Sequence, residues 1–574
     1  MGSDNYYRSR GSFGSFGDDR HDVDVLIIGG GCAGIAAAEK LLTSSEDVSV
    51  ALLEARSDLG GRVCSVDYRK DMDMGKLGGK RVDRFLQMSN KPGLSMNFNA
   101  TKSSSHDDPE EEDENVSAES QFANFPTELG GEMVHGYNGS LGKLVPEDLG
   151  LPLVDTMDQK CDALIETGRN HDSIHEVGEF ALESDLGDAF HRIEVLENLF
   201  EEAREEGWLV EGEEDMSLKS FFAQEELPQE KWPMLCYFTA REYGATLENF
   251  SAYGASENWD LWSCGNEDSL LSRTDWQGGA MGSVIRRTHP TFFKHLQAST
   301  DELVDASCDN VSRLQVRTSC PVAEIDDRID ENSTNNVVLV TEANTGKVWR
   351  ARKVIVTIPL SMLKKSVNSE ERGIRILPCL PQDKIAAINN MGMGVGGKLI
   401  IRLKKRLWEK EVCCIATDKF GSQIWISSYG KDVKNGDEAT GIITLLVASA
   451  HMRDKLNELT DCGHEWLLTY LNDTFLSFLF GEQTERVVQS AIWVDWSSEP
   501  YVEGLYSFPH VNGKMADREI LARPEFEDKL HFAGEHTERI YYGSIHGAMD
   551  SGTRAATQCL KTFEKSFLTD LENF

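Results

Sequence analysis

Two apolar runs near the start of the chain flank a stretch with helical character. Val25–Ile28 and Val48–Leu53 are almost continuously apolar, which is typical of strands buried on both faces of a parallel sheet. Ile35–Leu42 lies between them, is rich in alanine and predicts a helix. A strand, a helix and a second strand in this order predict the start of a doubly wound α/β sheet.

The turn between the first strand and the helix carries three glycines in the spacing G-x-G-x-x-G. Gly29 suits a tight turn, Gly31 lets the backbone approach a phosphate, and Gly34 allows the helix to pack closely on the strand. The helix N-terminus then directs its N–H groups at an anion. Glu54 ends the second strand twenty residues after Gly34, where a carboxylate can bind ribose hydroxyls. This context predicts a dinucleotide site; a glycine loop beside a surface glutamate is the alternative.

Strands and helices alternate through the rest of the chain. Val316–Ile325 and Val337–Val340 predict strands, and Lys353–Leu360 predicts a buried strand that stops at Pro359. The chain between residues 151 and 275 has a helical character. This alternation predicts two interleaved domains, each assembled from segments that are separated in the sequence.

The overall charge is strongly acidic. Asp and Glu total 96 against 58 Lys and Arg, which gives a formal net charge of −38. This charge disfavours nucleic acid as a direct partner and suits a cationic substrate. No apolar run reaches the length of a membrane span. The 12 cysteines form no C-x-x-C pair, so we expect no metal site and reduced thiols, in the cytoplasm or the nucleus.

Two segments are predicted to lie outside the folded domains. Residues 1–22 lack an apolar signal core and are expected to form a disordered tail. Residues 67–124 are expected to form an acidic, low-complexity insertion, which includes the run DDPEEEDE at 107–114. The insertion could dock a protein partner; a tolerated surface insertion is the alternative.

The segment after the second strand resembles the flavin-containing amine oxidase family. Residues 54–62 read EARSDLGGR and match the family's E-A-x-x-x-x-G-G-R run. The resemblance implies FAD rather than NAD as the cofactor. It places Arg62 near the flavin diphosphate and puts Arg56 and Gly61 in the same cofactor-binding loop. Within the family, the chain is most similar to polyamine and spermine oxidases.

A second segment resembles the family's L-G-A-x-W-I-H-G run, which lines the reactive face of the flavin. Residues 129–136 read LGGEMVHG, so the resemblance implies that Gly131, Met133 and Val134 contact the cofactor. Met133 replaces a tryptophan that is common in the family. His135 takes the position of a substrate-facing histidine, where it could accept an ammonium proton or hold the amine. A purely structural histidine is the alternative.

Two further segments supply an expected lysine and two expected aromatic side chains. Residues 391–403 resemble L-x-x-G-x-x-x-K-I/V-x-L, which implies that Lys398 lies below flavin N5, bridged by water. A cation there favours negative charge on the reduced ring. Residues 496–507 resemble W-x-x-x-P-Y-x-x-G-S-Y-S, which implies that Trp496 packs near the flavin and Tyr506 forms a wall beside the amine. A solvent lysine and ordinary core aromatics are the alternatives.

The resemblance is most specific near the C-terminus. It implies that Gly534 and Glu535 bind the ribityl or phosphate region of the flavin. A helix that starts near Ile545 directs its N–H groups at flavin N1 and O2, which become negative on reduction. Ser544 faces flavin and substrate, at a position that is often aromatic in plant polyamine oxidases. Val322 matches the family's adenine-contacting valine.

The resemblance predicts an FAD-dependent amine oxidase with Lys398 and His135 as catalytic residues and a polyamine as its substrate. Hydride passes from carbon to flavin N5, the imine hydrolyses, and O2 reoxidises the flavin to give hydrogen peroxide. The FAD is expected to be noncovalent, because no cysteine lies between residues 506 and 534, where some monoamine oxidases carry their linking cysteine. A methyl-lysine histone demethylase, an L-amino-acid oxidase and a catalytically silent flavoprotein scaffold are the alternatives.

The predicted fold is α/β: a doubly wound, Rossmann-like FAD-binding domain interleaved with an α+β substrate-binding domain. We assign residues 23–66, 125–150, 276–360 and 491–565 to the FAD-binding domain. The substrate-binding domain takes residues 151–275 and 361–490, and a C-terminal tail takes residues 566–574.

Overall fold

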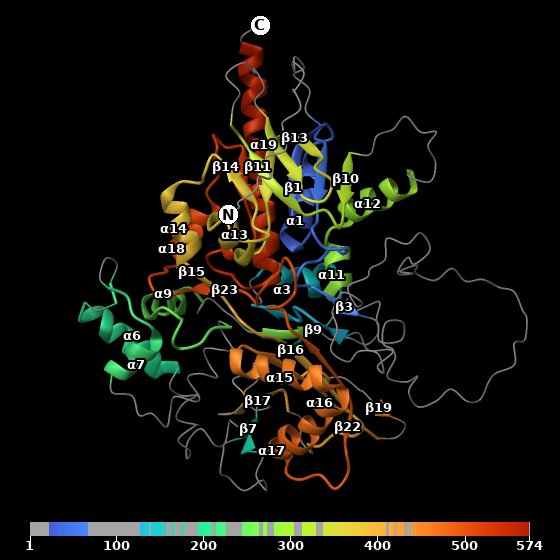
Figure 1. Cartoon of the computed structure of the whole chain (residues 1–574), viewed down its shortest axis with the longest axis vertical. Helices are drawn as coiled ribbons and strands as arrows, with labels where there is room; N and C mark the ends of the chain where they lie inside the picture. Colours follow the sequence, from blue (N-terminus) through green and yellow to red (C-terminus); the bar gives the residue numbers. More distant parts are fainter. Residues whose placement is uncertain are drawn as a thin grey trace, which may run out of the picture.

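A computed structural model of the chain arranges the described residues around two large sheets (Figure 1). The residues described are 22–66, 127–136, 139–151, 153–155, 163–165, 175–176, 193–207, 209–210, 214–225, 244–262, 268–271, 281–302, 313–328, 337–408, 412–417, 420, 422–429, 434–435, 438–439 and 441–572. The insertion expected over 67–124 lies outside them, as does the expected tail except for Asp22. Among the helices in these ranges, none is both long and apolar enough to cross a membrane.

The larger sheet is built around the first apolar run of the sequence. β1 (Val23–Ile28) lies parallel to β2 (Val50–Leu53) on one side and to β13 (Val348–Val356) on the other. β10 (Leu314–Arg317) extends the sheet beyond β2, and β24 (Leu530–Phe532) pairs with the end of β13. The parallel sheet therefore unites segments from both ends of the chain, which confirms the doubly wound class.

An antiparallel flank completes this sheet. β11 (Val322–Asp326) and β12 (Val338–Glu342) pair antiparallel, and β14 (Arg375–Leu377) adds a parallel edge beside β11. The single strand expected over Val316–Ile325 was wrong. The chain forms β10 and β11 instead, because it bends at Thr318 and Ser319, where Ser319 has a φ of 52° that no strand contains.

Helices cover both faces of the larger sheet, as its continuous apolar strands require. Val25 and Ile27 point into one core, and Leu26 and Ile28 point into the other. The helices on the first face are α1 (Cys32–Ser44), α11 (Met281–Thr288), α12 (Pro290–Glu302) and α19 (Ile545–Glu572). The helices on the second face are α13 (Leu360–Val367), α14 (Gln382–Asn390) and α18 (Ala516–Ala522).

Two of the expected domain limits differ from the observed elements. α13, α14 and β14 come from the range 361–490, yet they belong to the larger sheet, because Ala387 and Ile388 are buried in its second core. The tail expected over 566–574 is helical as far as Glu572, because no glycine or proline interrupts α19 after Gly552. The rest of the expected domain division stays a prediction.

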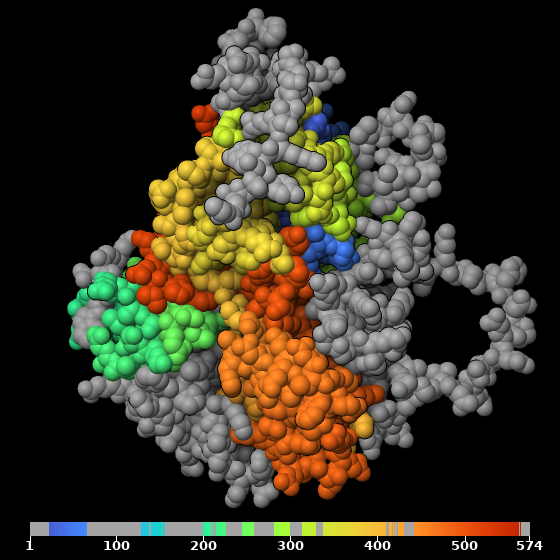
Figure 2. Space-filling model, viewed as in Figure 1, coloured from blue at the N-terminus to red at the C-terminus, as the bar shows by residue number. Residues whose placement is uncertain are grey.

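The smaller sheet has the strand order β22-β16-β21-β18-β17-β7-β8. Its strands are β7 (Ala163–Ile165), β8 (His175–Glu176), β16 (Gly397–Leu403), β17 (Cys414–Thr417), β18 (Ser422–Ile426), β21 (Ile442–Val447) and β22 (Val488–Val494). Its apolar core packs against α15 (Ala450–Cys462), α16 (His464–Tyr470) and α17 (Ser477–Phe480). Figure 2 shows these helices as the orange lower body of the molecule.

Short elements connect the two bodies. A three-stranded sheet has the order β5-β9-β6, and two-stranded ribbons pair β3 with β4, β15 with β23, and β19 with β20. Their bounds are β3 (Ser65–Val66), β4 (Thr127–Glu128), β5 (Met133–His135), β6 (Leu153–Asp155), β9 (Asp268–Leu271), β15 (Met391–Met393), β19 (Lys434–Asn435), β20 (Glu438–Ala439) and β23 (Ser507–Pro509). A side lobe contains α6 (Ile193–Glu205), α7 (Leu218–Gln224) and α9 (Ala252–Trp262) (Figure 1).

The contact between α1 and α19 gives a test of this packing. A Cβ added to Gly552 of α19 would overlap the carbonyl oxygen of Ala33 in α1. We expect Gly552→Ala to lower the free energy of unfolding by roughly 1–3 kcal/mol, because this tightly packed contact cannot accept a methyl group. The matched control is Gly282→Ala in α11, where a Cβ would meet only the Ser65 side chain, at 3.3 Å. Equal melting temperatures for the two variants would contradict the expectation.

Candidate active site

A large cavity lies between the two sheets. It encloses about 2000 Å³, its open mouth included. Its walls come from the carboxyl ends of β1 and β2, from the start of α19, and from β16, β18 and β21 of the smaller sheet. The predicted site residues that line it are Gly29, Gly31, Glu54, Arg56, Gly61, Arg62, Gly131, Met133, His135, Val322, Lys398, Trp496, Tyr506, Gly534, Glu535, Ser544 and Ile545.

Two predicted residues do not line the cavity. Gly34 lies inside α1, where a Cβ would overlap the carbonyl oxygen of Gly29, so it serves the packing of the helix on the turn. The side chain of Val134 is buried in the first core of the larger sheet, so its expected contact with the cofactor would be made by backbone and stays a prediction. The alternation of strand β5 explains this orientation, because Met133 and His135 face the cavity and Val134 faces away.

The glycine turn exposes backbone to the cavity. Gly29 has a φ of 109°, a conformation that favours glycine. Gly31 is the N-cap of α1 and offers no side chain to the N–H groups of the first turn. Gly61 faces it so closely that an added Cβ would lie 3.2 Å from the Gly31 Cα. The N-terminus of α1 therefore meets a passage walled by glycines, where an anionic diphosphate can contact backbone N–H groups.

Glu54 closes the turn from the end of β2. Its Oε2 accepts a hydrogen bond from the backbone N–H of Gly30 at 2.6 Å, and its Oε1 accepts one from the N–H of Arg56 at 2.8 Å. Burial raises the pKa of the Glu54 carboxyl, although both backbone donors oppose the shift. The carboxylate is thus fixed at the rim of the glycine turn, where it can also accept from ribose hydroxyls.

Glu535 is the centre of a buried polar network that joins the two ends of the chain. Its Oε1 lies 3.1 Å from Nη1 of Arg62, and its Oε2 accepts from the Ser507 hydroxyl at 2.6 Å and from the Gly543 N–H at 3.1 Å. Arg518, which is fully buried, donates to the same Ser507 hydroxyl at 2.7 Å. Burial alone would raise the pKa of Glu535, but Arg62 and the other donors hold it lowered, at about 2.

A second ion pair secures the loop that carries Trp496. Nη2 of Arg56 lies 3.0 Å from Oε1 of Glu499, and its guanidinium lies 5.9 Å from the centre of the Trp496 ring. The Trp496 indole N–H donates to the backbone carbonyl of Leu129 at 2.8 Å. Trp496 therefore connects the cofactor loop of residues 54–62 with the glycine segment that starts at Leu129.

Lys398 enters the cavity from β16 and meets a carboxylate there. Its Nζ donates to Oε2 of Glu132 at 2.6 Å and to the carbonyl of Gly130 at 3.0 Å. Nζ also lies 5.2 Å from the centre of the Trp425 ring. The water bridge from Lys398 to flavin N5 stays a prediction. Glu132 was not predicted. The sequence signal that could have identified it is an acidic residue at the variable position of the LGGEMVHG segment, in a chain whose second flavin-facing motif carries a lysine.

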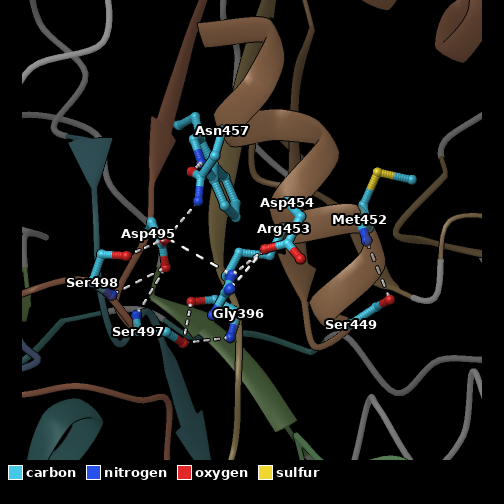
Figure 3. A network of polar contacts seen from close by, with 10 residues as sticks. Gly396, Ser449, Met452, Arg453, Asp454, Asn457, Asp495, Ser497 and Ser498 are labelled. Atoms are coloured by element: carbon cyan, nitrogen blue, oxygen red, sulfur yellow. Dashed lines mark hydrogen bonds and ion pairs between the residues drawn. The ribbon is translucent and has the colours of Figure 1, made fainter. Parts of the chain in front are cut away.

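Figure 3 shows a polar network around Asp495 that includes Gly396, two residues before Lys398 in the sequence. Gly396 donates its N–H to the Ser497 hydroxyl at 2.7 Å, and Ser497 returns its N–H to the Gly396 carbonyl at 3.2 Å. Asp495 accepts from the Ser497 N–H at 3.0 Å and from the Asn457 side chain of α15 at 2.8 Å. The loop before Lys398 and the loop of Trp496 are thus held together on the smaller sheet.

The cavity becomes aromatic and apolar on the side of the smaller sheet. His135, Tyr506 and Ser544 lie there together with side chains that were not predicted, namely Gln423, Trp425, Leu446 and Tyr542. These four residues fall in no motif. Gln423 and Trp425 alternate along β18 and Leu446 lies on β21, and such alternation predicts burial but no function. The Ser544 hydroxyl accepts from the Gly547 N–H at 3.0 Å, so it caps the N-terminus of α19.

The residues present fit FAD. The glycine-walled passage suits the diphosphate, because a Cβ on Gly31 would narrow it, and Glu54 suits the ribose. The capped N-terminus of α19 and the Lys398 side chain line the same cavity, so both can face a ring that gains negative charge on reduction. Val322 lines the cavity on the opposite flank, next to Cys320 and Pro321.

Comparisons with known proteins agree with this site. A family model described as flavin containing amine oxidoreductase matches residues 116–560, and an NAD(P)-binding Rossmann-like domain matches residues 27–92. Probable polyamine oxidase 5 of Arabidopsis thaliana is 21% identical, over 95% of this chain and 99% of that protein. The human lysine-specific histone demethylase 2 is 23% identical, over 94% of this chain and 54% of that protein.

The solved structures agree at the level of the fold. Cyclohexylamine oxidase from Brevibacterium oxydans superposes with a TM-score of 0.62 at 17% identity, over 95% of this chain and all of that one. The chain spans about half or less of the length of the histone demethylases it matches. The family match covers well over half of the chain. The chain belongs to the flavin-containing amine oxidoreductase family, and FAD is its cofactor.

Proposed function

We propose that this chain oxidises a small cationic amine, of the polyamine class, to an imine that water then hydrolyses to an aldehyde and an amine. The observation that carries the proposal is the continuity of the cavity. One space joins the glycine turn and Glu54 to the aromatic side that holds Lys398, His135 and Tyr506. A bound FAD and an amine substrate would therefore share one enclosed site.

The protein's own side chains would bind and orient the amine. FAD, when bound, supplies the two-electron oxidation and returns the electrons to O2, which gives hydrogen peroxide. Tyr506 would offer an aromatic ring that attracts a cation and excludes water. His135 would take the ammonium proton, so that the amine is neutral when its carbon–hydrogen bond reacts. Lys398 would supply a preorganised positive charge.

Three observations support a polyamine. The net charge of −38 attracts a polycation over long distances. The match to probable polyamine oxidase 5 covers nearly the whole of both chains. Ser544 is small and its hydroxyl is engaged in capping α19, so it leaves room beside Tyr506 for an extended substrate. Because the eight described cysteines have free thiols, we propose the cytoplasm or the nucleus as the location of the protein.

A methyl-lysine demethylase is the second candidate, because several curated relatives carry that name. Both candidate activities oxidise a carbon next to nitrogen. They differ in the molecule that carries this carbon, which is a free amine in one and a lysine of a histone in the other. The test is hydrogen peroxide production by the purified holoprotein with spermine, spermidine, their acetyl derivatives, amino acids and a dimethyl-lysine histone peptide. Turnover of the free polyamines alone would support the proposal. Turnover of the peptide alone would overturn the proposal in favour of the demethylase. If no amine gave hydrogen peroxide, a silent flavoprotein scaffold would be favoured.

The purified protein should be yellow and should release intact FAD on acid precipitation. Cys32 and Cys320 line the cavity, and burial raises the pKa of their thiols to about 12 and about 11. Such thiols are poor nucleophiles at neutral pH, so a covalent link to the flavin is not expected. The measurement is the absorbance of the supernatant after precipitation. Flavin retained by the pellet would contradict the expectation.

Lys398→Met should slow the chemistry far more than it weakens FAD binding. It keeps the length of the side chain and removes the charge beside Glu132. Removing one preorganised electrostatic partner costs on the order of 10²–10³ in rate. Stopped-flow absorbance should show slower flavin reduction by amine or slower reoxidation by O2, at normal FAD occupancy. Lys398→Arg, which keeps the charge, is the control. Rates within about twofold of the wild type in Lys398→Met would show that the lysine is a bystander.

A further inference from the structure

A lysine and a glutamate form a buried ion pair in the cavity wall. The Lys398 and Glu132 side chains are only 3% and 4% exposed, and their charged atoms are 2.6 Å apart. They come from different bodies of the molecule, because Lys398 lies on β16 of the smaller sheet and Glu132 immediately precedes β5. Both residues line the same cavity as the glycine turn. The pair therefore places an anion and a cation together within reach of the cofactor space.

We propose that Glu132 is a positioning residue that fixes Lys398 in the cavity and cancels its charge, and thereby sets the reduction potential of the bound FAD. The inference rests on the proposed function in taking Lys398 as the electrostatic partner of the flavin. A buried cation without a partner would favour the reduced, more negative flavin strongly. With Glu132 in contact, the charge of Lys398 is offset in part, so this preference is smaller.

The backbone around Glu132 holds the carboxylate in place. Gly131 donates its N–H to the carbonyl of Arg62 at 3.0 Å, and Trp496 holds the Leu129 carbonyl at 2.8 Å. A Cβ on Gly130 would overlap the same Arg62 carbonyl, so the segment lies directly against the cofactor loop. The backbone next to Glu132 is therefore fixed against the cofactor loop, and its carboxylate lies 2.6 Å from the Lys398 Nζ.

The other end of the pair is equally constrained. Lys398 lies in the ladder of β16, opposite Leu446 of β21 and Val494 of β22. The Gly130 carbonyl accepts a second bond from its Nζ, and the Trp425 ring lies beside it. The ladder bonds of β16 are made by backbone, so Glu132→Gln leaves the hydrogen bonds of the strand itself in place. A role in packing alone predicts that loss of Glu132 affects stability and leaves the flavin unchanged.

A double-mutant cycle on the holoprotein separates these roles. The variants are Glu132→Gln, Lys398→Met and the double variant, and the measurement is the midpoint potential of bound FAD by dye equilibration. We expect Glu132→Gln to raise the potential and Lys398→Met to lower it. Each shift should be at least about tenfold in the reduction equilibrium constant, or roughly 30 mV for a two-electron couple. The double variant should return to within about threefold of the wild type, since opposite charges are removed together.

The matched control is Glu128→Gln. Glu128 is 2% exposed and belongs to the same segment, but it does not line the cavity and accepts from the Met281 N–H at 2.8 Å. Its loss should leave the potential unchanged. If Lys398→Met fails to fold, a comparison of the potentials of Glu132→Gln and Glu128→Gln still tests the inference. Only Glu132→Gln should raise the potential.

The outcomes distinguish this inference from the proposed function. Unchanged potentials in Glu132→Gln, or shifts in the double variant that add in one direction, would overturn the inference even if amines are oxidised. If Glu132→Gln raises the potential of FAD and Lys398→Met lowers it, but the protein oxidises no amine, only the proposed function is overturned. Protein that carries no FAD would overturn both.

Discussion

The site depends on a carboxylate that remains ionised while it is buried. Glu535 follows β24, and although burial opposes it, its pKa is held at about 2 by Arg62, by His536 and Arg518, and by the hydrogen bond from Ser507. Arg62 belongs to the N-terminal cofactor loop, so this contact joins segments 473 residues apart. Removal of either charge would leave the other unpaired in a cavity wall, which is costly in a protein interior. The ion pair therefore links the cofactor loop after β2 to the segment that follows β24.

The second body is attached through the same kind of contact. β16 carries Lys398 to the glycine segment of residues 129–132, and Trp496 reaches that segment from the loop after β22. The network of Asp495, Ser497 and Gly396 joins these two attachments. Both sheets therefore contribute to the cavity through loops and strand ends that brace one another, and the rigid sheets behind them fix its shape.

The sequence predicted the parallel part of the larger sheet and most of the cavity wall. Those predictions rest on local signals: Gly29 to Gly34 for a turn before a helix, and apolar runs for buried strands. It did not separate β10 from β11, because the bend at Thr318 and Ser319 between them carries no glycine. It missed Glu132, Trp425 and Gln423, because their places in the cavity wall arise from contacts between strands that are distant in the sequence. The motif also could not tell that the side chain of Val134 faces the core, since strand alternation decides which side chain faces the cavity.

The charges of the cavity constrain how a cationic amine can be recognised. The carboxylates described in its lining are all engaged: Glu54 by backbone N–H groups, Glu132 by Lys398 and Glu535 by Arg62. An ammonium group that approached Glu132 or Glu535 would compete there with the cation that each carboxylate already contacts. The proposed cationic amine would therefore be attracted, without displacing an existing ion pair, by aromatic rings of the lining and by the acidic field of the whole chain, which acts over longer distances.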